Sequence, residues 1–392
     1  MSRCLEESHS SMKSANINYM PGVDHLRGLA SLIIVFYHGF QLHKISAYPG
    51  GNYPPNWALA PATNPFYGIL MEGHSSVALF MVLSGFIFTM GSLTREIAYR
   101  QFIVNRLWRI FPLFIFITVC AMSIHPETYN FLGLLEVILF QANQPGAMAG
   151  GTYLATAWSV AVEFQFYFAF PFLLRFTQRY GARYLFAVLF LFISLRYLAF
   201  LQTGRTHALA YMTIIGRMDQ FVFGMLCAIL YQRYPAKVDR LCYALPLGTA
   251  LVIWWMYFFN HHGGYLGKGW ERMFWPTADG IAWAIFLMTF VPLGQRLSGI
   301  FSKALGFVGE MSFSIYLMHF VVISAIIKAG WTIPFTNVPT TNAFLNTLVF
   351  YLPITIAVSS MTYFVVEKPF LSMRKSYQQA AKAEAAKKAV TA

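Results

Sequence analysis

The stretch FLNTLVFYLPITIAVSSMTYFVV, residues 344–366, holds 23 residues without one charged side chain. About 20 apolar residues in a helix suffice to cross the hydrocarbon core of a bilayer. A second run, ALPLGTALVIWWMYFF, covers residues 244–259. Strands of a transmembrane β-barrel alternate apolar and polar residues over about ten positions. These continuous runs therefore indicate membrane-spanning helices.

The composition of the whole chain agrees with this interpretation. Of 392 residues, 57% are hydrophobic and only 11% are charged, whereas a soluble domain carries about 25% charged residues. This excludes a water-soluble globular enzyme and a disordered chain. We therefore predict an all-α fold, a polytopic transmembrane helical bundle.

The apolar runs predict about ten spans. We expect them at 24–43, 70–91, 107–124, 154–174, 184–202, 212–231, 243–259, 275–293, 305–327 and 344–365. The run 131–141 is too short to cross and is interpreted as an interfacial or re-entrant piece. The first run, Leu26–Phe40, is expected to remain as an uncleaved signal-anchor helix.

Basic residues predict the orientation of the bundle. If the N-terminus is cytoplasmic, 21 of the 28 Lys and Arg residues fall in cytoplasmic segments and 6 in outer segments, with Arg217 inside a span. This asymmetry favours both termini inside, and it explains the net charge of +13 without a nucleic-acid partner. We divide the chain into a cytoplasmic segment 1–22, a membrane domain 23–372 and a cytoplasmic Ala/Lys-rich tail 373–392.

Ionisable side chains inside a bilayer are costly and are usually paired or functional. The expected spans contain Arg27, His38, Glu163, Arg217, Asp219, Asp279, Glu310 and His319. Arg217 and Asp219 are spaced i, i+2, so they face different directions and each needs its own partner. For His319 the sequence leaves structural and functional roles equally open.

Arg27 and His38 share one face of the first helix. Eleven residues separate them, which is about three turns and a rise of about 16 Å. A cation at the cytoplasmic boundary then lies below an imidazole deep in the membrane, where the imidazole can serve as a general base. The alternative is an anchoring arginine with a histidine that only packs.

Two further features are candidates for substrate chemistry. Arg106 and Arg109 lie one turn apart, so they can clamp phosphate groups or simply anchor the cytoplasmic helix end. Glu163 needs a partner at its depth; it either orients a histidine, as in catalytic triads, or forms a structural pair with Arg217 or another cation. Nucleotide-binding glycine loops, G-x-S-x-G, H-E-x-x-H and C-x-x-C patterns are missing from the sequence, so we expect no metal.

Several motifs, in this order, resemble those of the acyltransferase 3 family of membrane acyltransferases. They are Arg27 and His38 as R-x10-H, Leu83-Ser84-Gly85-Phe86, Arg106-x-x-Arg109, Trp158-Ser159 with Glu163 and Phe166-Tyr167, Ser312–His319, and Val366-Glu367-Lys368-Pro369. Val160 stands where the family usually has Leu.

The resemblance implies transfer of an acyl group, usually acetyl, from cytoplasmic acyl-CoA to a hydroxyl. The implied acceptor is an extracytoplasmic glycan, such as O-antigen or exopolysaccharide, or its lipid-linked precursor. The implied location is the bacterial cytoplasmic (inner) membrane, with membrane lipids as surroundings and acetyl-CoA as donor. We expect a bare membrane module without the SGNH hydrolase-like domain of some relatives, so any second step would need another protein.

Combined with the physical arguments, the resemblance suggests roles for eight residues. The expected catalytic residues are His38 and Glu163, the donor-binding residues are Arg27, Arg106 and Arg109, and the substrate-binding residues are Trp158, Tyr167 and His319. Direct transfer and a covalent acyl-enzyme on Ser84 both remain open. The alternatives are a proton-coupled secondary transporter, which would use the buried His and Glu as a relay, and a glycan-precursor flippase.

Overall fold

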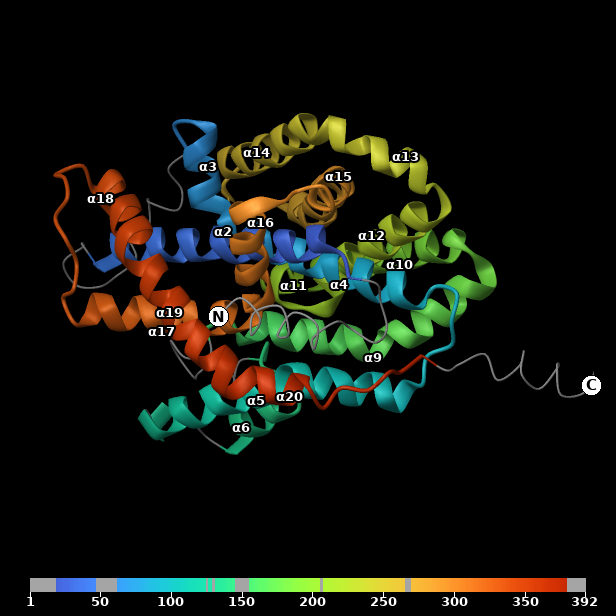
Figure 1. Ribbon diagram of the computed structural model, residues 1–392, viewed down its shortest axis with the longest axis horizontal. Helices are drawn as coiled ribbons and strands as arrows, with labels where there is room; N and C mark the ends of the chain where they lie inside the picture. Colours follow the sequence, from blue (N-terminus) through green and yellow to red (C-terminus); the bar gives the residue numbers. More distant parts are fainter. Residues whose placement is uncertain are drawn as a thin grey trace, which may run out of the picture.

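The computed structural model describes residues 19–46, 62–124, 126–128, 131–144, 155–204, 207–264 and 269–378. In these residues the chain is helical, and the sole β-pairing among them is an isolated bridge between Ile97 and Gln378. The helices pack against one another in a single bundle (Figure 1). The predicted all-α class is therefore confirmed.

Eleven longer helices build most of the bundle. They are α2 (Pro21–Ser46), α4 (Ser76–Ser92), α5 (Tyr99–Ile124), α9 (Ala157–Tyr180), α10 (Ala182–Thr203), α12 (Ile214–Arg233), α14 (Leu245–His261), α15 (Trp275–Gly294), α16 (Gly299–Glu310), α17 (Ser312–Lys328) and α19 (Leu352–Thr362). Short helices between them include α3 (Pro65–Glu72), η1 (Gly73–Ser75), α6 (Phe131–Ile138), α11 (His207–Met212), α13 (Pro235–Arg240), η5 (Trp270–Met273), α18 (Pro339–Asn346) and α20 (Lys368–Leu371). The eight-residue α6 corresponds to the short run that the sequence marks as unable to cross.

The number of spans differs slightly from the predicted ten. Within the described ranges, eight helical stretches are long and apolar enough to cross a membrane, and α16 with α17, which meet at a 73° bend, form a ninth. The remaining predicted span is α2. Its 26 residues give a length of about 39 Å, but Asp24, Arg27 and its histidines make it more polar than the others. The inward orientation of both termini remains a prediction.

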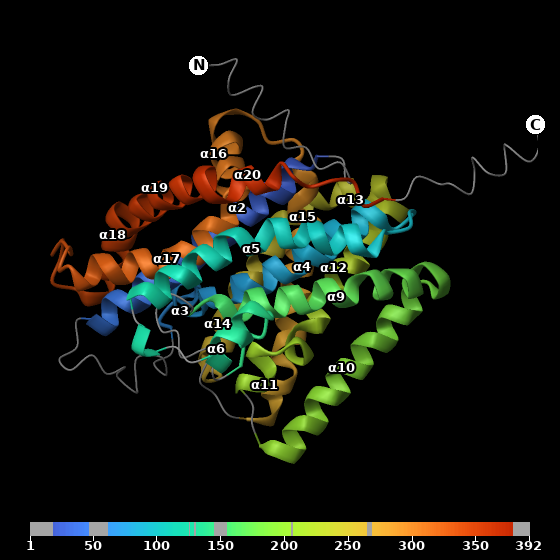
Figure 2. The same ribbon diagram turned by 90° about the horizontal axis from the view of Figure 1, so that it is seen from below.

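Helix α2 tolerates these polar residues because it lies inside the bundle. It contacts α4, α15, α16, α17 and α18, so its side chains meet protein rather than lipid. Helix α10 is the opposite case. It lies at one edge of the bundle (Figure 2) and exposes Phe186, Phe190 and Leu198, as a lipid-facing surface requires.

Two glycines allow α4 and α12 to pack closely. A Cβ atom at Gly85 would collide with the carbonyl oxygen of Phe221, and one at Gly224 would collide with that of Val82. Small residues at helix contacts let backbones approach inside membranes. This contact holds Ser84, which precedes Gly85, at the centre of the bundle.

The end of the described chain packs on α5. The backbone N–H of Ala98 donates to the carbonyl of Tyr377 at 2.9 Å. The Asn105 side chain donates to the carbonyl of Lys375 at 2.5 Å and accepts from its N–H at 3.1 Å. Residues 374–378, which the sequence analysis assigns to the cytoplasmic tail, therefore pack against the rest of the protein. Residues 1–18 and 379–392, the rest of the predicted terminal segments, lie outside the described residues.

Candidate active site

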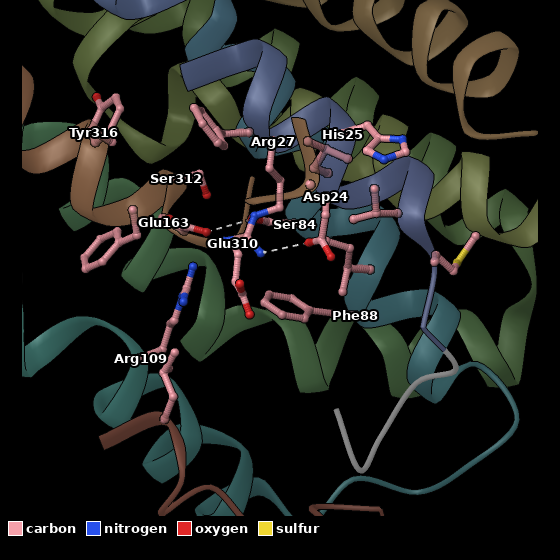
Figure 3. A pocket seen from close by; sticks show the side chains of 18 of the residues that line it. Asp24, His25, Arg27, Ser84, Phe88, Arg109, Glu163, Glu310, Ser312 and Tyr316 are labelled. Carbon is pink, nitrogen blue, oxygen red and sulfur yellow. Dashed lines mark hydrogen bonds and ion pairs between the residues drawn. The ribbon is translucent and has the colours of Figure 1, made fainter. Parts of the chain in front are cut away.

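A cavity of about 530 Å³ opens among the helices where α2 begins. Its walls come from α2, α4, α5, α9, the bend between α16 and α17, and the segment after α20. Five cationic side chains line it, namely Arg27, Arg106, Arg109, Lys303 and Arg374. Three carboxylates line it as well, those of Asp24, Glu163 and Glu310 (Figure 3). The excess of cations favours an anionic ligand.

The predicted donor-binding arginines all line this cavity. Arg27 lies 3.6 Å from Asp24, and Arg109 forms an ion pair with Glu367. The guanidinium of Arg106 stacks 4.8 Å from the centre of the Phe88 ring. Buried Nε of Arg106 and buried Nη2 of Arg109 have no hydrogen-bond partner. These N–H groups remain available to phosphate oxygens, for which guanidinium geometry is well suited.

Arg374 is a fourth arginine that the sequence analysis does not identify. It lines the same cavity, and its Nε donates to the carbonyl of Leu371 at 3.0 Å, which leaves its two Nη groups for a ligand. Burial, followed by repulsion from Arg109, Arg106 and Arg27, lowers the pKa of Arg374 to about 9. Like charges gathered in this way are stabilised by a polyanion.

Glu163 lies in this cavity and not beside His38. Its Oε1 accepts hydrogen bonds from Ser84 Oγ at 2.7 Å and from Tyr167 Oη at 2.6 Å. Figure 3 shows it near Arg27 and Ser84. The expected contact with His38 or Arg217 is not formed, because Glu163 lies level with the start of α2, whereas His38 lies three turns further along. Ser84 and Tyr167 instead both donate to one oxygen of the carboxylate, Oε1.

His38 pairs with His319, a partner 281 residues away in the chain. His319 Nδ1 lies 3.0 Å from the carbonyl oxygen of Ile315 and must donate to it, because a carbonyl can only accept. In the neutral pair, His319 Nε2 is then an acceptor, and His38 Nδ1–H donates to it at 2.8 Å. This chain of hydrogen bonds fixes the tautomer of His38 and leaves a lone pair on its Nε2. A neutral imidazole in this tautomer is a competent general base.

The histidine pair lies just beyond the cavity. Neither ring lines it, but Tyr316, one turn before His319, does, and the two rings are 5.8 Å apart. Tyr316 Oη and Ser159 Oγ, both on the cavity wall, form a hydrogen bond of 2.6 Å. This bond joins α9 to α17 at the cavity wall. His319 is fully buried, whereas His38 is only half-buried.

Trp158, the neighbour of Ser159, does not line the cavity. Its ring is 4.8 Å from that of Tyr211, and Arg217 lies over both rings, 4.2 Å from the centre of Tyr211. Arg217 Nε donates to the Tyr211 carbonyl at 2.8 Å, while Asp219 pairs with Arg196 at 3.1 Å. Arg217 and Asp219 thus have different partners, as their i, i+2 spacing predicts.

A buried pair near Tyr211 is also missing from the sequence analysis. Glu72 and His74, on either side of Gly73, are joined by a 2.8 Å contact, and the His74 ring packs 5.2 Å from Tyr211. A histidine two residues after a glutamate, at the start of an apolar run, is the available sequence signal. In the described ranges no group of three or more His, Cys, Asp or Glu side chains is placed to hold a metal ion.

Comparisons with known proteins show which proteins the chain is similar to. A family model described as an acyltransferase domain matches residues 20–364. The chain is 24% identical to a "Putative O-acetyltransferase" of Staphylococcus aureus strain MRSA252, over 93% of this chain and 60% of the relative. It is also 24% identical to a "Putative peptidoglycan O-acetyltransferase" of Bacillus subtilis, over 79% of this chain and 50% of the relative.

A viral relative is matched over more of its length. The chain is 22% identical to a "Putative acetyltransferase" of the Acidianus two-tailed virus, over 80% of this chain and 86% of the relative. The chain spans about half to three fifths of the length of the bacterial relatives. No solved structure matches it.

Proposed function

The chain belongs to the acyltransferase 3 family of membrane acyltransferases, and we propose that it transfers an acetyl group from cytoplasmic acetyl-CoA to a hydroxyl of an extracytoplasmic glycan. The observation that carries this proposal is the fixed tautomer of His38, next to a cavity rich in arginine. A donor with several phosphates fits the cavity, and a hydroxyl acceptor needs the base.

The donor binds with its phosphates at the start of α2. Arg27, Arg106 and Arg109, as predicted from the sequence, and Arg374 in addition, form hydrogen bonds and ion pairs with the phosphate oxygens. The pantetheine arm runs along the cavity past Ser84 toward Tyr316. For the thioester to reach His38, the Ser159–Tyr316 hydrogen bond opens, and the carbonyl carbon enters the space beside the histidine pair.

His38 then supplies the base. The acceptor hydroxyl gives its proton to His38 Nε2 while its oxygen forms a bond to the thioester carbon. The carbon–sulfur bond breaks, and the proton passes from His38 to the departing CoA sulfur. His319 stabilises the cation that His38 transiently becomes, because the shared hydrogen bond strengthens when its donor is charged. Proton transfer by a positioned base contributes about 10²–10⁴-fold to the rate.

Glu163 acts within the donor cavity in this account. Its carboxylate holds Ser84 and Tyr167 in place and partly balances the four guanidiniums, so the cavity stays ordered before the donor arrives. Trp158 lies on the acceptor side, whereas Tyr167 contacts the donor. His319 acts through His38 and is a positioning residue.

A covalent route has one specific observation in its favour. Ser84 Oγ lines the cavity and donates to Glu163 at 2.7 Å, which is the arrangement of a nucleophile with an adjacent base. On this route Ser84 receives the acetyl group first and passes it to the acceptor. We favour direct transfer because the imidazole with a fixed tautomer is that of His38, which is placed to act on the acceptor and not on Ser84.

Purified protein in liposomes tests the proposal. Acetyl-CoA is supplied with a bacterial surface glycan, free CoA is measured with a thiol reagent, and ester formation is measured by NMR. We expect both signals in the wild type, loss of both in Arg106→Gln, and little change in Arg100→Gln, an exposed residue of the same helix. Movement of glycan or protons across the membrane without release of CoA would instead support the transporter or flippase.

A further inference from the structure

A second cavity, of about 60 Å³, lies where α12 and α15 begin and where α3 and α14 end. It is lined by Arg217 of α12, by Arg272 and Trp275 near the start of α15, and by the carboxylates of Glu72 and Asp279. Neither the family motifs nor the mechanism above uses these five residues. The cavity is therefore a separate feature that needs its own explanation.

Three nitrogen donors on its walls are buried without a partner. They are Nη2 of Arg217, Nε of Arg272 and Nε1 of Trp275. The remaining nitrogens of Arg217 donate to the Tyr211 carbonyl at 2.8 Å and to the Gln220 amide oxygen at 3.3 Å. A buried donor left without an acceptor is destabilising, so three such donors around one cavity favour the binding of a group that supplies acceptors.

Arg272, like Arg217, has some nitrogens that form hydrogen bonds and one that has no partner. Its Nη2 donates to the His262 carbonyl at 3.1 Å, and its Nη1 donates to the Gly264 carbonyl. Each guanidinium thus hydrogen-bonds only to uncharged oxygens. Burial lowers the pKa of Arg272, as expected for a cation taken out of water. Glu72 and Asp279 lie close enough to interact electrostatically with Arg272 and Arg217, but neither carboxylate accepts a hydrogen bond from a guanidinium, so the unpartnered N–H groups remain for an incoming anion.

The carboxylates on the cavity wall are already engaged. Glu72 accepts from His74 Nε2 at 2.8 Å and from Asn260 Nδ2 at 2.7 Å. Asp279 accepts from the Trp255 indole N–H at 3.2 Å. The unsatisfied groups are therefore donors, and the ligand has to supply acceptor oxygens. A volume of about 60 Å³ has room for one small polar group.

We propose that this cavity binds an oxyanion, a carboxylate or phosphate, carried by the acceptor, through the N–H groups of Arg217, Arg272 and Trp275. That the oxyanion belongs to the acceptor rests on the proposed function. The His74 ring lies 5.4 Å from Tyr37, and the Tyr37 ring lies 4.8 Å from His38. The subsite is thus two ring contacts from the base, so an acceptor held by its anionic group presents a nearby hydroxyl to His38.

A matched set of sugars tests this inference on the purified full chain in lipid nanodiscs. Methyl glucoside, methyl glucuronide and methyl glucoside 6-phosphate differ only in the group at carbon 6. Binding is measured by thermal stabilisation without donor, and acetyl transfer is measured with acetyl-CoA. We expect at least one of the two anionic sugars to bind roughly 10- to 100-fold more tightly than the glucoside, the gain for a hydrogen bond to a charged group. Which of them binds identifies carboxylate or phosphate as the ligand.

Trp275→Phe removes one N–H and keeps an aromatic ring, so it is the decisive variant. This variant should weaken binding of the anionic sugar by roughly 10-fold or more. Trp254→Phe, at an exposed residue of α14, should leave the binding of all three sugars unchanged. Equal binding of all three sugars, no binding by any, or unchanged binding in Trp275→Phe would overturn the inference.

The two readouts separate the inference from the proposed function. Selective binding that depends on Trp275, without acetyl transfer to any hydroxyl, would keep the subsite and reject the transferase. Acetyl transfer to all three sugars at equal rates, unchanged in Trp275→Phe, would keep the transferase and reject the subsite.

Discussion

Replacing Arg374 with glutamine removes one cation from the donor cavity while the chain segment stays in place. Asn105 holds that segment through the backbone of Lys375, so the variant should fold normally. The attraction between a positive charge and a phosphate about 5 Å away is about 3 kcal/mol at an effective dielectric constant of about 20. Arg374 is half-buried, so we take about half of that, roughly 1.5 kcal/mol or about 10-fold in affinity.

The assay compares two donors, acetyl-CoA and acetyl-pantetheine, which lacks the nucleotide phosphates. In Arg374→Gln we expect KM for acetyl-CoA to rise about 10-fold, with kcat unchanged and with no effect on acetyl-pantetheine. Lys375→Gln, the exposed neighbour, is the control and should behave as wild type. Equal losses with both donors, or no loss with acetyl-CoA, would refute the assignment of Arg374 to the phosphates.

Three further substitutions test other parts of the account. His319→Leu should lower kcat by about 10- to 100-fold, the value of one hydrogen bond to a charged group, with KM for acetyl-CoA unchanged; a normal kcat would show that the tautomer of His38 is not set by this pair. Gly85→Ala should cost about 1–3 kcal/mol in stability, since its Cβ meets the Phe221 carbonyl, and a wild-type melting temperature would contradict this. Ser84→Ala should keep acetyl transfer within a few-fold; loss of transfer, with an acetyl ester detected on wild-type protein by mass spectrometry, would favour the covalent route.

Local patterns in the sequence predict much of the cavity. Helical periodicity places Arg27 on the face of α2 that carries His38, and the one-turn spacing of Arg106 and Arg109 places both at the same cavity. The apolar runs predict the helices because lipid permits few other backbone structures. Only the count differs, since α2 is shielded from lipid and is more polar than a lipid-exposed span.

Contacts between distant parts of the chain could not be predicted in this way. The pairing of His38 with His319 depends on how α2 and α17 cross, which no spacing within either helix encodes. The expected contact of Glu163 with His38 is not formed. The way α9 packs beside α2 places Glu163 level with the start of α2, whereas His38 lies three turns further along. Arg374 was missed because its segment has the composition of a solvated tail, whereas its backbone pairs with α5.

The central claim, that His38 is the base for acetyl transfer, is tested most directly by single-turnover transfer from acetyl-CoA in His38→Gln. Glutamine can still hydrogen-bond to His319 but cannot take a proton. We predict that transfer slows by about 10²–10⁴-fold with the affinity for acetyl-CoA unchanged, while His261→Gln, an exposed histidine, transfers at the wild-type rate. Transfer by His38→Gln at the wild-type rate would contradict the account.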